Sequence, residues 1–161
     1  MAENENEATA ASAADASPQF AVQRTYIKDF SFETPMGVKV FTQAFQPKVK
    51  MDVNTRGNKV GDNIHEIVLT ITITAQVEDE TAYLIELQQA GIFAITGFAD
   101  EQLQHVLGAV CPNFLFPYAR EAIDSMAVKG GFPPLSLAPI DFDAIFRQSQ
   151  ATAADSGQSL N

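Results

Sequence analysis

The chain has 161 residues, 46% of them apolar, and a formal net charge of −10 at pH 7. This is the length of one ordinary domain, and its acidity argues against binding to nucleic acid or to anionic lipid, because both carry phosphate. No apolar segment reaches the roughly 20 residues that span a bilayer, so we expect no direct membrane insertion.

The two ends of the chain differ in composition from the middle. Residues 1–18 and 149–161 are rich in small and polar residues and contain no aromatic side chain, which predicts a disordered N-terminal tail and a flexible C-terminal tail around a folded domain at 19–148. The first segment also lacks the basic and apolar parts of a secretory signal. Cys111, the single cysteine, excludes an intrachain disulfide, so we expect a reducing, cytoplasmic location.

The first half of the domain predicts four strands. Residues 20–33 predict the first strand. Even-numbered positions carry most of its large apolar side chains, which places them on one side of that strand: Phe20, Val22, Tyr26, Phe30 and Phe32. A second strand follows Pro47 and ends before a loop predicted over residues 56–61, where two glycines lie. Residues 66–77 alternate most regularly between aliphatic and polar side chains, which is typical of a strand with one buried and one solvated face. A short acidic connector then leads to a fourth strand at 81–95, which predicts an antiparallel hairpin.

The second half predicts helices. Apolar residues recur at helical spacing after Asp100, which we expect to be the N-cap, and Pro112 must bend or break this helix. A helical face then continues to Gly130-Gly131, which predicts a C-cap and turn. A short helix follows at about 141–148. Strands followed by helices indicate an α+β fold with a four-stranded antiparallel sheet and packed helices.

Few residues point to catalysis. His65 and His105 are forty positions apart, and we expect them to be buried or capping residues. Cys111 has no orienting group near it in the sequence and is expected to be a small buried hydrophobe. There is no phosphate-binding glycine loop. We therefore expect neither an enzyme nor a metal or other cofactor.

The aromatic content is unusual. Twelve Phe and three Tyr occur without a single Trp. They either fill the core or, because such a sheet buries one face only, form a further apolar surface for oligomerisation or for a ligand.

A second feature is a face that mixes apolar and acidic residues. Leu84 and Glu86 alternate with apolar neighbours on their strand, and Asp29 and Glu33 do the same on the first strand. If these sides of the two strands lie on the same face of the sheet, three carboxylates surround an exposed leucine. Either this is an ordinary solvated face, or it is a docking patch for a basic partner.

Four long motifs resemble the SecB family of export chaperones. They are CPNFLFPYARE at 111–121, GFPPLSLAPIDFD at 131–143, ELQQAGIF at 86–93 and YIKDFSFE at 26–33. The resemblance extends from about Phe20 to Phe146. It implies a homotetramer, built as a dimer of dimers, that binds unfolded preproteins and delivers them to the SecA motor ATPase without a cofactor.

The same resemblance implies roles for individual residues. Asp29, Glu33, Leu84 and Glu86 match the SecA-docking patch, which is the mixed face described above, and Gln89 matches a position near the dimer–dimer contact. The client groove of the family is apolar and rich in aromatic residues. By position, its lining here is expected to be Phe20, Val22, Phe41, Phe45, Val49, Met51, Tyr83, Ile85, Leu87 and Met126.

Two other classes of function remain open on the residues alone. One is a carrier of small hydrophobic ligands built on an α+β fold, which requires a closed pocket with convergent polar groups. The other is an oligomer with a purely structural role.

Overall fold

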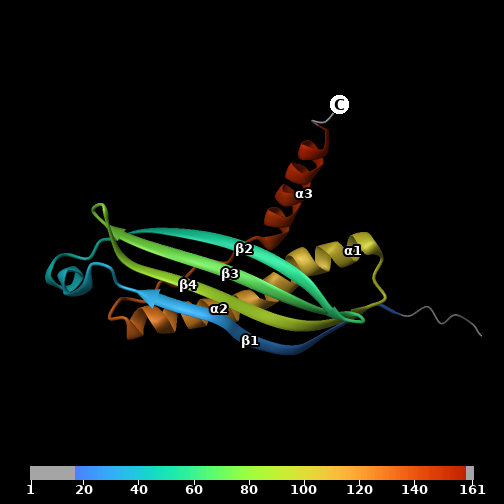
Figure 1. Cartoon of the computed structure of the whole chain (residues 1–161), viewed down its shortest axis with the longest axis horizontal. Coiled ribbons are helices and arrows are strands. Elements are labelled where there is room, and N and C mark those ends of the chain that lie inside the picture. Colours follow the sequence, from blue (N-terminus) through green and yellow to red (C-terminus); the bar gives the residue numbers. More distant parts are fainter. Residues whose placement is uncertain (1–16, 159–161) are drawn as a thin grey trace, which may run out of the picture.

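A computed structural model of the chain describes residues 17–158. Four strands are followed by helical segments, as the sequence predicts (Figure 1). In chain order the elements are β1 (Gln19–Glu33), the 3-10 turn η1 (Gly37–Thr42), β2 (Lys48–Gly61), β3 (Ile64–Val77), β4 (Glu80–Thr96), α1 (Asp100–His105), the π-helical segment η2 (Val106–Val110), α2 (Cys111–Lys129) and α3 (Phe142–Gln158).

The sheet is antiparallel throughout, with the order β1-β4-β3-β2. Two-residue turns close both hairpins, and in each turn one residue has a positive φ, Asn63 at 58° and Glu78 at 57°. The remaining connection, through η1, joins the two edge strands. The α+β architecture with a four-stranded antiparallel sheet is therefore confirmed.

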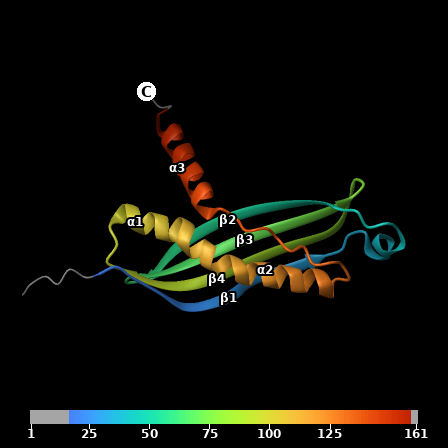
Figure 2. The same cartoon turned by 180° about the vertical axis from the view of Figure 1, so that it is seen from behind.

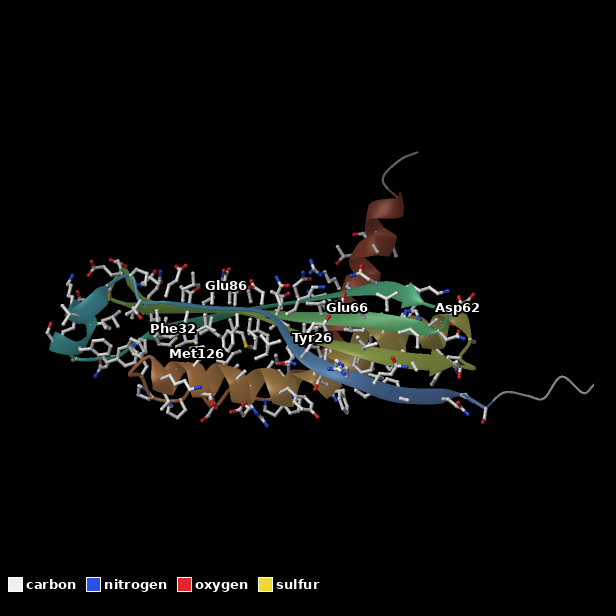
Figure 3. The ribbon with its side chains drawn as sticks, turned by 60° about the horizontal axis from the view of Figure 1, so that its bottom comes forward. Tyr26, Phe32, Asp62, Glu66, Glu86 and Met126 are labelled. Atoms are coloured by element: carbon white, nitrogen blue, oxygen red, sulfur yellow. The ribbon has the colours of Figure 1, made fainter. Side chains whose placement is uncertain are left out.

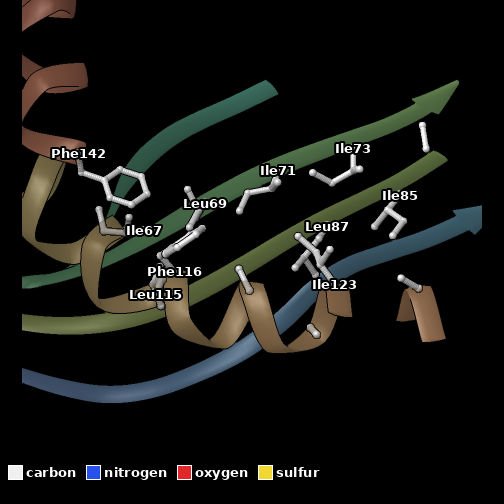
Figure 4. Packing of buried hydrophobic residues seen from close by; sticks show 14 of the residues in the cluster. Ile67, Leu69, Ile71, Ile73, Ile85, Leu87, Leu115, Phe116, Ile123 and Phe142 are labelled. Atoms are coloured by element: carbon white, nitrogen blue, oxygen red, sulfur yellow. The ribbon is translucent and has the colours of Figure 1, made fainter. Parts of the chain in front are cut away.

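One face of the sheet carries the core. Figure 2 shows α2 lying over this face of the sheet. From Ile67 onward in β3 and from Tyr83 onward in β4, the odd-numbered residues lie on the helix-facing side, and most are fully buried with Leu115 and Ile123 of α2 (Figure 4). The even-numbered residues of the same strands lie on the opposite face, which no helix covers in the described part of the chain. We call this the open face.

The loop predicted at residues 56–61 is wrong, because β2 continues as a strand to Gly61. Gly57 pairs with Ile67, and a Cβ atom at Gly57 would lie 3.0 Å from the Ile67 side chain. The glycine therefore marks a close approach inside the strand and not a turn. The turn itself is formed by Asp62 and Asn63.

The helix around Pro112 continues without a break. The N–H of Cys111 bonds to the carbonyl of Val106, five residues back, and the wider π-turn accommodates the proline that follows.

The N-cap prediction for Asp100 is wrong. Ala99 is the N-cap, it makes no side-chain capping bond, and Asp100 lies in the first turn, where its charge complements the helix dipole.

The C-terminal helix is longer than predicted. α3 begins where expected, with the Asp141 carboxylate accepting a bond from the N–H of Ala144 at 2.9 Å, but it continues to Gln158 and projects from the sheet (Figure 1). Most of the predicted C-terminal tail is thus helical, whereas residues 159–161 lie outside the described residues. Residues 1–16 of the predicted N-terminal tail lie outside them as well. No helix in residues 17–158 is long and apolar enough to cross a membrane.

β1 does not alternate as simply as its sequence predicts. Two β-bulges, at Gln23 and Lys28, each insert one residue opposite β4. Because one extra residue reverses the alternation, Tyr26 lies on the open face and not with Phe30 and Phe32. The second bulge restores the phase, so Phe20 and Val22 share the helix-facing side with Phe30 and Phe32.

Candidate functional site

The four residues of the proposed docking patch meet on the open face. Glu33 is paired with Leu84, and Glu86 with Ser31, while Asp29 is paired with Gln88 on the same side. Residues that are directly opposite in an antiparallel pair share a face. Figure 3 shows Glu86 on the side of the sheet away from α2, opposite to Phe32 and Met126. The three carboxylates are exposed and Leu84 is half-buried. A hollow of about 360 Å³ adjoins Leu84.

An aromatic cluster lies at the same end of the sheet, on the helix-facing side. Phe132 is at its centre, with ring centroids 4.6 Å from Tyr83, 5.1 Å from Phe45 and 5.3 Å from Phe41. The helix C-cap explains the position of Phe132. Gly131 has φ +89°, and the N–H of Phe132 reaches back to the carbonyl of Ala127, which is the Schellman pattern that places the next apolar residue on the core.

Exposed apolar side chains continue from this cluster along β2. Phe41, Val49 and Met51 are 55%, 45% and 38% exposed, and α2 packs on β4 and β3 and not on this edge strand. Val53 follows on the same side and lines a pocket of about 530 Å³ between β2, η2 and α3. We call this continuous surface, from Phe41 to Phe146, the β2 track. Its members are Phe41, Phe45, Val49, Met51, Val53, Leu107, Ile145 and Phe146.

The other predicted groove residues lie elsewhere. Ile85 and Leu87 are completely buried beneath α2, and Tyr83 is only 1% exposed, so these three support the surface from below. Met126 is half-buried on α2. Phe20 and Val22 pair with the end of β4, at the opposite end of the sheet from Phe32. Sequence reasoning missed Phe132 and the α3 wall of the pocket. The Gly-Phe pair after a predicted helix end is the signal that points to Phe132.

A polar network on the open face was also missed. Glu66 accepts hydrogen bonds from the Tyr26 hydroxyl, from Lys28 at 2.8 Å and from Asn58 at 3.4 Å. The Lys28 and Tyr26 bonds hold the pKa of the Glu66 carboxyl down at about 2, and the carboxylate in turn raises the pKa of Tyr26. Three strands are joined through this one side chain.

Gln89 has a partner within its own chain. Its side chain is buried, and its amide donates to the carbonyl of Tyr26 at 3.0 Å. Ile27, which is paired with Gln89, is half exposed and lies with Tyr118 of α2 around a second hollow.

The cysteine is buried, and the two histidines border the track: His65 lines the pocket of about 530 Å³, and the ring centroid of the exposed His105 lies 5.6 Å from that of Phe146. Burial raises the pKa of the Cys111 thiol to about 12, so it carries no thiolate at neutral pH, and the prediction of a small buried hydrophobe is confirmed. His65 is half-buried beside Lys59, and desolvation first, then the lysine, lower its pKa. His105 pairs with Asp143 of α3.

The geometry is thus an open, mostly apolar track on one side of the sheet and an acidic patch around a leucine on the other. Two comparisons with known proteins give the same family, and a third supports the fold. A family model described as preprotein translocase subunit SecB matches residues 13–153. The protein-export protein SecB of Hahella chejuensis is 56% identical over 132 residues, which is 82% of this chain and 83% of that protein.

Among solved structures, a SecB-like chaperone of Mycobacterium tuberculosis, in complex with a ChAD peptide from the HigA1 antitoxin, matches with a TM-score of 0.57. The match covers 75% of this chain and 87% of that one, at 12% identity, and so it supports the fold alone. The family match and the close relative settle the classification: this chain belongs to the SecB family.

Proposed function

We propose that this protein is an export chaperone that binds unfolded preproteins, keeps them competent for translocation and delivers them to the SecA motor ATPase. The observation that carries the proposal is the β2 track, an exposed apolar surface that a folded monomeric enzyme would cover. An unfolded chain exposes apolar segments in abundance, whereas a folded chain hides them. Contacts of this kind select for the unfolded state more than for a sequence.

The deciding experiment compares two states of one preprotein. A reduced, unfolded preprotein should bind with micromolar affinity or better, and the same protein, once folded, should not bind. Tight binding of a lipid-like small molecule with no preference for unfolded protein would instead identify a hydrophobic-ligand carrier. Binding of neither would leave a structural oligomer.

A charge on the β2 track should weaken client binding. Met51→Asp places a carboxylate among the exposed apolar side chains of β2, and we expect about tenfold weaker binding of the unfolded preprotein, because the charge loses hydration against apolar client segments. Gln76→Asp is the matched control, since Gln76 is exposed on the opposite face of the sheet, on the neighbouring strand β3. Calorimetric titration measures both. Equal losses in the two variants would show that a general disturbance of the sheet, and not the track, is responsible.

The acidic patch is the proposed SecA-docking surface. Glu86→Lys reverses a charge at its centre, and we expect docking of SecA to weaken by about tenfold while client binding persists, because patch and track lie on opposite faces of the sheet. Glu101→Lys makes the same charge change on α1 and should leave docking within about twofold. Loss of both activities in Glu86→Lys would indicate a disturbed fold.

Assembly into a dimer of dimers is proposed from a second aromatic row, which is exposed at Phe20, Phe114 and Tyr118 and buried at Phe93. Phe20, Phe93, Phe114 and Tyr118 form a chain of ring contacts with centroids 5.5–6.1 Å apart, and Phe114 and Tyr118 lie on the outer side of α2, 36% and 47% exposed. Exposed aromatic side chains that gather in one row are typical of a surface that a partner covers. A second copy of the chain, through Gln89 and its neighbours, is the partner that the family resemblance implies.

The end of α3 lies outside this row. Deletion of residues 149–161 removes exposed side chains up to residue 155 and none of the aromatic row, so we expect the shortened protein to elute from a sizing column at the tetramer position. Elution as a dimer or monomer would place part of the assembly contact on α3.

A further inference from the structure

The pocket at the end of the β2 track has a basic lining, although the protein is strongly acidic. Its volume of about 530 Å³ lies in the range of small-molecule sites. Val53, Leu107 and Phe146 give it apolar walls from β2, η2 and α3, and Figure 1 shows α3 leaving the sheet on the side of β2. The net charge of the chain is −10, yet none of the described residues that line this pocket is acidic. The ionisable side chains in its lining are Lys59 and His65.

Lys59 lies on the same side of β2 as the track. No register shift interrupts the pairing of β2 with β3 from Lys48 to Lys59, so the odd-numbered residues of β2 share one face over this length. The even-numbered Lys48, Lys50 and Arg56 lie on the open face. Lys59 is therefore the one basic side chain that β2 carries on the track side. The apolar track ends in a positive charge about 20 Å along the strand from Val53.

This lysine has no acidic partner in the described part of the chain. Lys28, Lys39 and Lys50 each form an ion pair there, and Lys59 forms none. Its cross-strand neighbour is His65. Desolvation first, and then the Lys59 charge, lower the pKa of His65. At neutral pH the imidazole is therefore mostly uncharged and offers one ring N–H as a hydrogen-bond donor, while the lysine ammonium supplies the charge.

The acidic side chains next to the pocket in the sequence are engaged elsewhere. Glu66 follows His65 but lies on the open face, where it binds Lys28, and Asp143 of α3 pairs with His105. A lysine near the end of an edge strand also guards that edge against pairing with another chain. Guarding requires exposure alone. A charge and a hydrogen-bond donor beside an apolar pocket suit, in addition, a ligand that has an apolar part and an anionic part.

We propose that the Lys59 end of the β2 track selects client segments in which a carboxylate lies about four residues from an apolar side chain. The inference rests on the proposed binding of unfolded clients and names a preference within it. The apolar side chain enters the pocket between Val53 and Phe146, and the carboxylate binds the Lys59 ammonium and accepts the ring N–H of His65. The spacing follows because an extended client rises by about 3.3 Å per residue, as β2 does.

The overall acidity of the protein does not prevent this contact. Charges are screened over about 8 Å at physiological ionic strength, so a client carboxylate at the pocket interacts mainly with the groups that line it. The acidic docking patch lies on the opposite face of the sheet. A local attraction for acidic client segments is therefore compatible with a net charge of −10.

Peptides that differ at one position test the preference. Each is capped, unstructured and carries the same aromatic residues, with Asp, Asn or Lys about four positions after the last of them. We expect the full-length protein to bind the Asp peptide about fivefold more tightly than the Asn peptide, and the Lys peptide more weakly than either. Raising the salt concentration from about 0.1 M to about 1 M should bring the three affinities together. Equal binding of the Asp and Asn peptides at low salt would overturn the proposal.

Two lysine variants assign the preference to one side chain. Lys59→Gln should bind the Asp and Asn peptides equally, with the affinity for the Asn peptide unchanged. Lys48→Gln is the matched control, because it removes the same exposed charge from the open face at the other end of the same strand, and it should keep the fivefold ratio. A preference that survives in Lys59→Gln, or that is lost equally in both variants, would contradict the proposal.

A photocrosslink locates the bound segment. Benzoylphenylalanine in place of the last aromatic residue of the Asp peptide should attach to Leu107, Ile145 or Phe146, which wall the pocket. Attachment only to the aromatic cluster around Phe132 would place the carboxylate away from Lys59 and refute the proposal. Decanoate that bound more tightly than the Asp peptide, and only with Lys59 present, would assign the pocket to small amphiphilic anions instead.

The Asn peptide separates this inference from the proposed function. If it binds as tightly as the Asp peptide, client binding stands and the preference for a carboxylate is refuted. If neither this peptide nor an unfolded preprotein binds, the chaperone function itself is refuted.

Discussion

Phe132→Ala should lower the free energy of unfolding by about 3–5 kcal/mol, the range for removing a buried aromatic side chain. Phe132 is 5% exposed and contacts the rings of four other residues, Phe32, Phe41, Phe45 and Tyr83. The loss combines the transfer of its ring to water with a cavity that these rings cannot fill, because they come from β1, from β4, from η1 and from the segment between η1 and β2. Chemical denaturation at a fixed protomer concentration measures it.

Phe41→Ala is the matched variant within the same cluster. Phe41 is 55% exposed, so its truncation should cost about 1 kcal/mol or less in stability and should instead weaken binding of an unfolded preprotein. The pair thus separates the rings that support the surface from those that form it. If Phe41→Ala were as destabilising as Phe132→Ala, the aromatic cluster would be core throughout, and the β2 track would begin only at Val49.

The features that sequence alone predicts are those with strong local patterns. Alternation in residues 66–77 gives a strand because its odd-numbered aliphatic side chains are buried on the helix-facing side. The parity of Glu33, Leu84 and Glu86 places them on one face because no bulge intervenes among them. The docking patch is therefore largely recoverable from pattern. The side on which its fourth member, Asp29, lies is also predicted correctly, because Asp29 follows the Lys28 bulge and no bulge separates it from Glu33.

What sequence does not predict depends on contacts between distant residues. Tyr26 lies on the open face because Glu66, forty positions away, accepts its hydroxyl. Gly57 favours a turn by its residue type alone, but the reason for the glycine is the close approach of the Ile67 side chain from the neighbouring strand. The groove residues divide into exposed and buried ones, such as Met51 and Leu87, by the path of α2 across β4 and β3, which no local pattern specifies.

Glu66→Gln should lower the free energy of unfolding by about 2 kcal/mol near neutral pH, since hydrogen bonds to a charged group are worth about 1.5–3 kcal/mol. The effect should depend on pH in a defined direction. The hydrogen bonds of Lys28 and Tyr26 depress the pKa of Glu66 in the folded state to about 2, below its ordinary value of 4.5. A depressed pKa contributes stability that is complete above the unfolded-state value and is lost as the pH falls through the folded-state value.

The difference between wild type and Glu66→Gln should therefore be constant above about pH 5.5 and shrink between about pH 4.5 and 2, where wild-type Glu66 becomes neutral. Denaturation curves at pH 7 and at pH 2.5, at one protomer concentration, measure it. Glu86→Gln, which changes an exposed carboxylate on the same face, should stay within about 0.5 kcal/mol of wild type at pH 7. A Glu66→Gln deficit that persists undiminished at pH 2.5 would mean that shape, and not charge, is what this buried carboxylate contributes to the sheet.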